Sequence, residues 1–178
     1  MSDSDEMGAV MDAMDNRYFG KYRGKVDNAA DPMRRGRLFV KVPAILGESG
    51  VWAMPCVPYA GDQVGFYALP EPGTGVWVEF EGGNIDFPIW TGCFWADGQI
   101  PVQDAMPGIR FLRTKAITIR IDDNLGEIVI EDAVGSSIRL GPGEITLTSA
   151  SISQSAQGAK TVLSPVSFDV NNGAFTVV

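Results

Sequence analysis

Alternating apolar and polar residues dominate the chain from residue 116 to residue 152. This period of two indicates short β-strands with one buried face. Turn-forming residues separate the runs, among them Gly126, Gly135 and the Gly141-Pro142-Gly143 triplet. The apolar positions of the runs are Ile117, Ile119, Ile121, Ile128, Ile130, Ile138, Leu140, Ile145 and Leu147.

The runs form a short, slightly irregular repeat. From Ile117 to Ile152 the first apolar positions follow one another at steps of about 11, 10, 7 and 7 residues, a spacing of the solenoid kind. One copy offers a single apolar row on strands of about four residues, which is too little surface to fold alone. We therefore expect other copies of the chain to supply the missing core, with the nine apolar positions facing inward.

The first half of the chain also contains short strand patterns, each bounded by glycine or proline. They lie at residues 18–26, 36–43, 51–56, 73–81 and 86–95. Five short strands in about 80 residues predict a small closed barrel of the OB type. The expected fold class is therefore all-β: an N-terminal OB-fold barrel followed by a C-terminal, intertwined trimeric β-helix.

The patterns divide the chain into four parts: residues 1–16, a barrel over 17–97, a linker over 98–112 and a needle over 113–178. In the first part Ser4 precedes two acids, and methionines follow at helical spacing. A capped amphipathic helix that packs on a neighbouring subunit and a frayed tail both remain open.

The end of the chain is less regular. Residues 149–158 are polar and small, so a flexible segment and a further strand are both open. Residues 160–163, 168–170 and 174–178 predict strands, the last two joined by a hairpin turn at 171–173.

Composition restricts the function. With 45% hydrophobic residues and no apolar run of membrane-spanning length, the chain resembles an ordinary soluble protein. The acidic N-terminus lacks the pattern of a signal peptide, so we expect synthesis and retention in the cytosol until assembly. The net charge of −8 argues against non-specific nucleic-acid binding.

Charge is distributed unevenly. Residues 1–16 carry five acids and no base, whereas 17–47 carry eight bases and two acids. This basic stretch suits self-association or docking to an acidic partner. Because OB barrels bind single-stranded nucleic acid with aromatic residues beside lysine and arginine, a nucleic-acid-binding face built on the aromatics Tyr18, Phe19, Tyr22 and Phe39 is an alternative.

No catalytic or metal-binding pattern emerges. Cys56 and Cys93 are expected to be small buried residues, and the chain has no histidine, the commonest general base and metal ligand. The acid pairs Asp122/Asp123 and Glu131/Asp132 are interpreted as turn-forming and solubilising. No nucleophile elbow, phosphate loop or dinucleotide fingerprint is present. We expect no enzymatic activity, cofactor or metal; an envelope-degrading enzyme is the weakest alternative.

An ordered series of residues resembles a known family. It comprises Asp31-Pro32, Gly36-Arg37, Val40, Val42-Pro43, Pro70, Pro72, Gly75-Val76, Val78, Phe80-Glu81-Gly82-Gly83, Pro88-Ile89 and Gly92. This series is similar to the OB-fold domain of the central spike proteins of contractile tails. These are the phage baseplate assembly protein V and baseplate spike families, the valine-glycine repeat spike of type VI secretion, and the spike of extracellular injection systems. The resemblance extends over residues 17–150, because the later strands look like the start of the family's trimeric β-helix.

The resemblance implies a structural role. A homotrimeric spike of this kind would be assembled into a phage tail baseplate or contractile injection particle, plug the inner tube beneath a hub protein and pierce the target cell envelope. The sequence leaves open which of these machines contains the chain. Some relatives carry a lysozyme domain between barrel and needle, and the linker here is too short for one.

The resemblance also implies partners for both ends. Some phage spikes close their own tip with a histidine-bound iron, so a chain without histidine is expected to bind a separate conical, PAAR-like tip protein. The contacts expected there are Phe175, Val177 and Val178. The residues expected to face the hub or another subunit are Met7, Met11, Arg17, Lys21, Arg23, Arg34 and Arg35.

Overall fold

A computed structural model describes residues 17–157, 159–172 and 174–177 of the chain. Met7, Met11 and Val178, which the sequence singled out as contact residues, lie outside the described residues. The chain divides into two compact units, Met1–Gln99 and Ile100–Val178. Almost all regular structure in the described part is β-strand, so the expected all-β class is confirmed.

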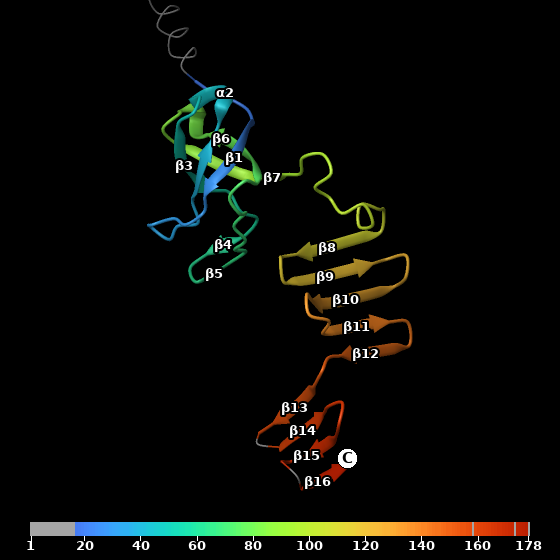
Figure 1. Cartoon of the computed structure of the whole chain (residues 1–178). Helices are drawn as coiled ribbons and strands as arrows, with labels where there is room; N and C mark the ends of the chain where they lie inside the picture. Colours follow the sequence, from blue (N-terminus) through green and yellow to red (C-terminus); the bar gives the residue numbers. More distant parts are fainter. Residues whose placement is uncertain (1–16, 158, 173, 178) are drawn as a thin grey trace, which may run out of the picture. The chain divides into compact units, whose positions relative to one another are not determined.

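The first unit is built on a closed five-stranded barrel (Figure 1). Antiparallel pairs join its strands except where β3 runs parallel to β7 and closes the barrel. This arrangement confirms the predicted small closed barrel of the OB type. The barrel strands, in the order in which they pair, are β1 (Tyr22–Asn28), β2 (Leu38–Lys41), β3 (Gly50–Pro55), β7 (Pro88–Phe94) and β6 (Gly75–Phe80).

Alternation along each strand fills the barrel. On β6, Val76, Val78 and Phe80 are buried while the residues between them are half-buried on the outer side. Each such side chain contributes about 1.5–3 kcal/mol by leaving water. The indole of Trp90 is also buried, and its N–H donates to the carbonyl oxygen of Gly36 at 3.2 Å. A buried polar group thus keeps its hydrogen bond.

Short elements that the sequence did not predict interrupt the barrel. They are a helix α2 (Pro43–Leu46), a hairpin of β4 (Ala60–Gly61) and β5 (Val64–Gly65), and a 3-10 turn η1 (Glu81–Gly83). The hairpin lies in the connection between β3 and β6 and carries exposed aromatic residues, among them Phe66 and Tyr67.

A carboxylate organises the loop between β1 and β2. Asp31 accepts hydrogen bonds from the backbone N–H groups of Met33 and Arg35 at 3.0 and 2.8 Å, and from the guanidinium of Arg37 at 2.7 and 3.1 Å. Its side chain is only 3% exposed. The bonds from Arg37, aided by those from the backbone, hold the pKa of Asp31 well below its usual range.

The second unit contains two antiparallel meanders. In the first, β8 pairs with β9 and each later strand pairs with the one before it, as Figure 1 shows. β8 begins inside the stretch that was predicted to be a linker. The strands are β8 (Ile109–Arg113), β9 (Ile117–Asp122), β10 (Glu127–Asp132), β11 (Ser137–Gly141) and β12 (Glu144–Thr148).

The second meander confirms the strands predicted near the end of the chain and adds one, β13, in the polar stretch. Its strands are β13 (Ile152–Ala156), β14 (Ala159–Leu163), β15 (Phe168–Val170) and β16 (Phe175–Val177). A β-helix of three chains is not shown by these sheets, which are formed by one chain.

The prediction of buried cysteines was wrong. Cys56 follows the last residue of β3, and Cys93 lies on the outward side of β7, so both are exposed free thiols. Among the described residues, no helix has the length and apolar character needed to cross a membrane.

The Asp31 loop gives a testable pH dependence. Because the folded-state pKa of Asp31 is lowered, its contribution to stability is complete above the unfolded-state value of about 3.9 and is lost as the pH falls below it. We expect Asp31→Asn to lower the melting temperature at pH 7 by at least a few degrees, and this difference to shrink between about pH 4 and pH 2.

The matched control is Asp27→Asn. Asp27 forms a solvent-exposed ion pair with Lys41 at 3.5 Å, so its loss should change the melting temperature little. Thermal melts followed by circular dichroism at several pH values measure both variants. An Asp31→Asn difference that stays constant with pH would contradict this account of the loop.

Candidate functional site

One face of the β8–β12 sheet is largely apolar, with Arg110 of β8 and Asp132 of β10 as charged positions at its edges. Residues directly opposite each other in antiparallel strands lie on the same face, and the pairings align the apolar positions in two rows across the sheet. The first row is Leu112, Ile119, Ile130, Ile138 and Leu147, and the second is Arg110, Ile121, Ile128, Leu140 and Ile145.

These apolar side chains are exposed in the single chain. Of the nine positions singled out in the sequence, Ile119 is half-buried and the other eight are exposed, from 37% for Ile121 to 71% for Ile145. A contiguous apolar face of this kind marks an interaction site. Leu112 joins the face with 54% exposure, and sequence reasoning missed it because its strand lay in the supposed linker.

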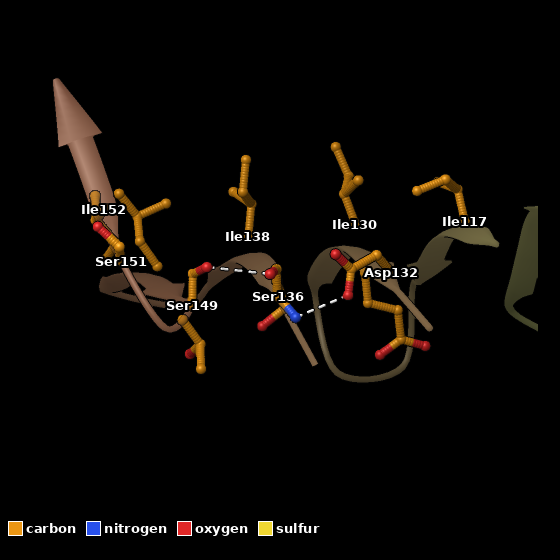
Figure 2. Close-up of a pocket in the computed structure, with 12 residues that line it drawn as sticks. Ile117, Ile130, Asp132, Ser136, Ile138, Ser149, Ser151 and Ile152 are labelled. Atoms are coloured by element: carbon orange, nitrogen blue, oxygen red, sulfur yellow. Dashed lines mark hydrogen bonds between the residues drawn. The ribbon is translucent and has the colours of Figure 1, made fainter. Parts of the chain in front are cut away.

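A groove of about 360 Å³ follows part of this face. Figure 2 shows Ile117, Ile130 and Ile138 projecting from the sheet in the same direction, with Ile152 of β13 in the same lining. Small polar groups border the apolar row. Among them, the hydroxyls of Ser136 and Ser149 lie 3.1 Å apart.

The opposite face of the sheet carries a network of charges. Arg120 lies 2.9 Å from Asp122, 3.4 Å from Asp104 and 3.8 Å from Glu127. The three acidic residues are buried, so their charges require partners. Two further arginines complete the network: Arg113 lies 2.8 Å from Asp104 and Arg139 lies 2.6 Å from Glu127.

This network also attaches the segment before β8 to the sheet, because Asp104 belongs to that segment. The next loop is tied down as well: the amide of Asn124 donates to the carbonyl oxygen of Pro107 at 3.1 Å, and the N–H of Asp123 donates to that of Gly108 at 2.9 Å. The charges of the polar face are therefore paired within one chain, although the Oδ2 atom of Asp104 accepts no hydrogen bond in the described part. The side chains of the apolar face stay exposed.

Two acids perform the turn-forming role expected from the sequence. Asp122 accepts hydrogen bonds from the N–H groups of Asn124 and Leu125, and Asp132 from those of Val134 and Ser136. Burial acts to raise the pKa of Asp122, but these bonds and Arg120 outweigh it and lower the pKa. The Ser136 bond is the main cause of the lowered pKa of Asp132. Among the described residues no cluster of metal-ligating side chains is found.

Comparison with known families adds a second line of observation. A type VI secretion system/phage-baseplate injector OB domain matches residues 22–95. A phage baseplate V C-terminal trimerisation domain matches residues 109–176. The chain belongs to the baseplate spike protein family. No curated protein matches its sequence.

Within the baseplate spike family, the trimerisation-domain match covers the strands that carry the apolar face. The trimerisation domain spans both sheets of the second unit and supports a homotrimer. The matched families are structural components of baseplates. The family implies assembly into a phage tail baseplate, and the resemblance read from the sequence is confirmed.

The basic residues expected at a hub or subunit contact are partly engaged within the spike chain itself. Arg17 donates to the carbonyl oxygen of Gly82 at 2.5 Å, and Lys21 pairs with Glu79 at 2.5 Å. Arg23 lies over the rings of Trp77 and Phe94 at 4.8 and 4.7 Å. The remaining two, Arg34 and Arg35, are exposed in the loop before β2.

The aromatic residues proposed for a nucleic-acid face do not form one. Tyr18 and Tyr22 pack with Phe80 at the barrel core, with ring centroids 6.0 and 5.7 Å from that of Phe80. Phe39 packs against Trp52 at 5.3 Å, and Phe19 is exposed. No observation favours the nucleic-acid alternative for this spike protein.

The charge network can be tested by removing its central arginine. Arg120→Met would leave three buried acids with fewer partners and weaken the attachment of residues 101–108. We expect the rate of proteolytic cleavage in this segment to rise by about tenfold or more. Limited proteolysis followed by mass spectrometry measures it.

Arg110→Met is the matched control, because Arg110 pairs with Asp123 while both side chains stay more than half exposed. Loss of such an exposed pair should change the rate little. Equal cleavage rates in the two variants would show that the Arg120 network does not hold the segment.

Proposed function

We propose that three copies of this chain form the central spike of a contractile baseplate, with the β8–β12 ladders combined in an intertwined β-helix. The observation that supports the proposal is the apolar face, which one chain leaves exposed while the charges of its polar face form ion pairs within the chain. The trimerisation-domain match supports the number three.

Burial of this face supplies the energy of assembly. Most of its isoleucine and leucine side chains keep about two fifths of their surface in the single chain, so covering the rest yields about 0.5–1 kcal/mol for each residue. The nine positions singled out in the sequence and Leu112 would give ten such residues in each of three chains, enough for a shared apolar core. Alternation keeps the charged network on the other side, where it would form the outer surface of the needle.

The role of such a spike is mechanical. Strands that interlock between chains unfold slowly because many cooperative contacts break together. This resistance suits a needle that plugs the inner tube and is driven through the target cell envelope when the sheath contracts. The proposed needle occupies residues 113–178 with β8 added at its start, and the barrel of residues 17–97 holds the three chains beneath a hub protein.

We further propose that a separate conical tip protein binds the end of the needle. Phe175 of β16 is 58% exposed, and Phe168 of the neighbouring strand β15 is 41% exposed. An apolar edge strand left uncovered is prone to aggregation. A cap at this end would protect it.

The oligomeric state is the first test. Sedimentation equilibrium should give three times the chain mass of 19.1 kDa, about 57 kDa. The mass should not change on dilution to low micromolar concentration, because an obligate trimer has no stable monomer. A stable monomer under these conditions would end the spike proposal.

The inward assignment of the apolar face is tested by Ile130→Asp. In the trimer three carboxylates would meet in a dry core, which costs several kcal/mol for each charge. In a single chain the side chain is 38% exposed, so the sheet can still form. We expect sedimentation to show loss of the trimer.

Thr146→Asp provides the control. Thr146 lies half-exposed on the polar face of β12, opposite Arg139 and beside Glu144, to which its hydroxyl donates at 3.2 Å. An added carboxylate would therefore have one base and one acid as neighbours and would stay in contact with water. This variant should remain trimeric. A soluble, protease-resistant trimer of Ile130→Asp would refute the assignment of this face to the core.

A further inference from the structure

The apolar surface of the β8–β12 sheet continues onto one face of the β13–β16 sheet. Ile152 of β13 lines the groove of about 360 Å³ together with Ile130 and Ile138 (Figure 2). The strand pairings place Leu163 of β14 opposite Ile152, and Phe168 of β15 opposite Leu163. Leu163 and Phe168 are 53% and 41% exposed in the single chain. This face of the second sheet is therefore as uncovered as that of the first.

A polar pair interrupts this second apolar face. Side chains two residues apart on a strand lie on the same side, so Gln154 shares the face of Ile152, and its partner in the register is Thr161 of β14. The hydroxyl of Thr161 donates to Oε1 of Gln154 at 3.1 Å. The same row is apolar again on the next two strands, where Val170 lies opposite Thr161 and Phe175 lies opposite Val170.

The position of this pair between apolar stretches has a consequence for an assembly. Both rows of the first sheet are isoleucine or leucine on every strand from β9 to β12. The trimerisation-domain match extends over residues 109–176 and so includes both sheets. In a trimer with threefold symmetry the same residue of each chain lies at the same height along the axis. Three copies of the pair Gln154 and Thr161 would then meet inside an otherwise apolar core.

The Gln154 amide has unused hydrogen-bonding capacity. A side-chain amide carries two N–H donors and an oxygen that accepts twice, and the Thr161 hydroxyl takes up one of these acceptor positions. Neither N–H of the amide donates to any group in the described part of the chain. The Thr161 hydroxyl donates its proton and still accepts. Each pair therefore offers two donors and at least two acceptor positions to the same pair in another chain.

We propose that Gln154 and Thr161 of three chains form a closed hydrogen-bonded layer inside the needle, in which each Gln154 amide donates to the pair of the next chain. The proposal rests on the trimer proposed above, with its apolar face inward. Burial of these amides without partners would be costly, and bonds between chains remove that cost.

The layer would fix the alignment of the three chains along the needle axis. Rows of isoleucine and leucine fit one another almost equally well after a shift of one chain along the axis. The same shift would place a Gln154 amide against the apolar residues of β15 and β16, where it finds no acceptor. A single polar layer in a long apolar interface thereby selects one alignment.

Hydrogen exchange of the glutamine side chains tests the layer. The full-length trimer is labelled on its glutamine amide nitrogens, exchange into deuterated water is followed by nuclear magnetic resonance, and Gln154→Leu identifies the Gln154 signal. Gln157 is the matched control, because it lies exposed in the turn after β13. We expect the Gln154 amide to exchange about a hundredfold more slowly than the Gln157 amide. Equal rates in a trimer would overturn the layer, since water would then reach both amides.

Paired substitutions test the hydrogen bonds themselves. Gln154→Leu and Thr161→Val should each lower the guanidinium concentration at which the trimer unfolds, because each leaves polar groups of the layer without partners. The variant with both changes should unfold at a higher concentration than either single variant, since no polar group is then left in the layer. Ser155 lies on the opposite face, so Gln154→Leu/Ser155→Ala should show additive effects. Additive losses in Gln154→Leu/Thr161→Val would contradict the proposal.

The alignment role has its own readout. Without the layer the chains should adopt more than one alignment, so the Gln157 amide should give several signals in Gln154→Leu/Thr161→Val and one in the unmodified protein. One signal in both would overturn this role. Sedimentation equilibrium of the same samples separates the two proposals. An unmodified chain that is not trimeric would overturn the spike proposal and the layer together, whereas a trimer with fast Gln154 exchange would overturn the layer alone.

Discussion

The structure depends on one constraint: a β-strand has two faces, and the short strands β8–β12 can satisfy only one of them within a single chain. Their polar face is closed by ion pairs around Arg120 and by the segment that contains Asp104. Their apolar face has no cover among the described residues of its own unit. The unsatisfied face is what converts a simple meander into a subunit of an assembly.

The charge network complements this face. Because the side-chain period in a strand is two, a slip of one residue would move the isoleucines outward and place Asp122 and Glu127 in the apolar core. Such a slip is very costly, so the buried ion pairs fix the register of the ladder while contributing little net stability themselves. In the proposed trimer the apolar rows would supply the energy of assembly and the charged rows its register.

The barrel unit differs from the second unit because its sheet closes on itself and buries a hydrophobic core within one chain. Several of its exposed aromatic residues gather at the β4–β5 hairpin, where they line a groove together with Arg34 and Arg35. The first unit thus buries its own core, whereas the second leaves an apolar face exposed.

The sequence by itself determined the strand pattern, the five-stranded barrel, the nine apolar positions of the ladder and the family, because period-two alternation and turn residues are local signals. Only the tertiary structure decided which groups meet across long separations. It brought Asp104 to Arg120, engaged Lys21 with Glu79, placed Tyr22 in the core, and exposed Cys56 and Cys93. Pairing between distant strands sets these contacts, and no local pattern encodes it.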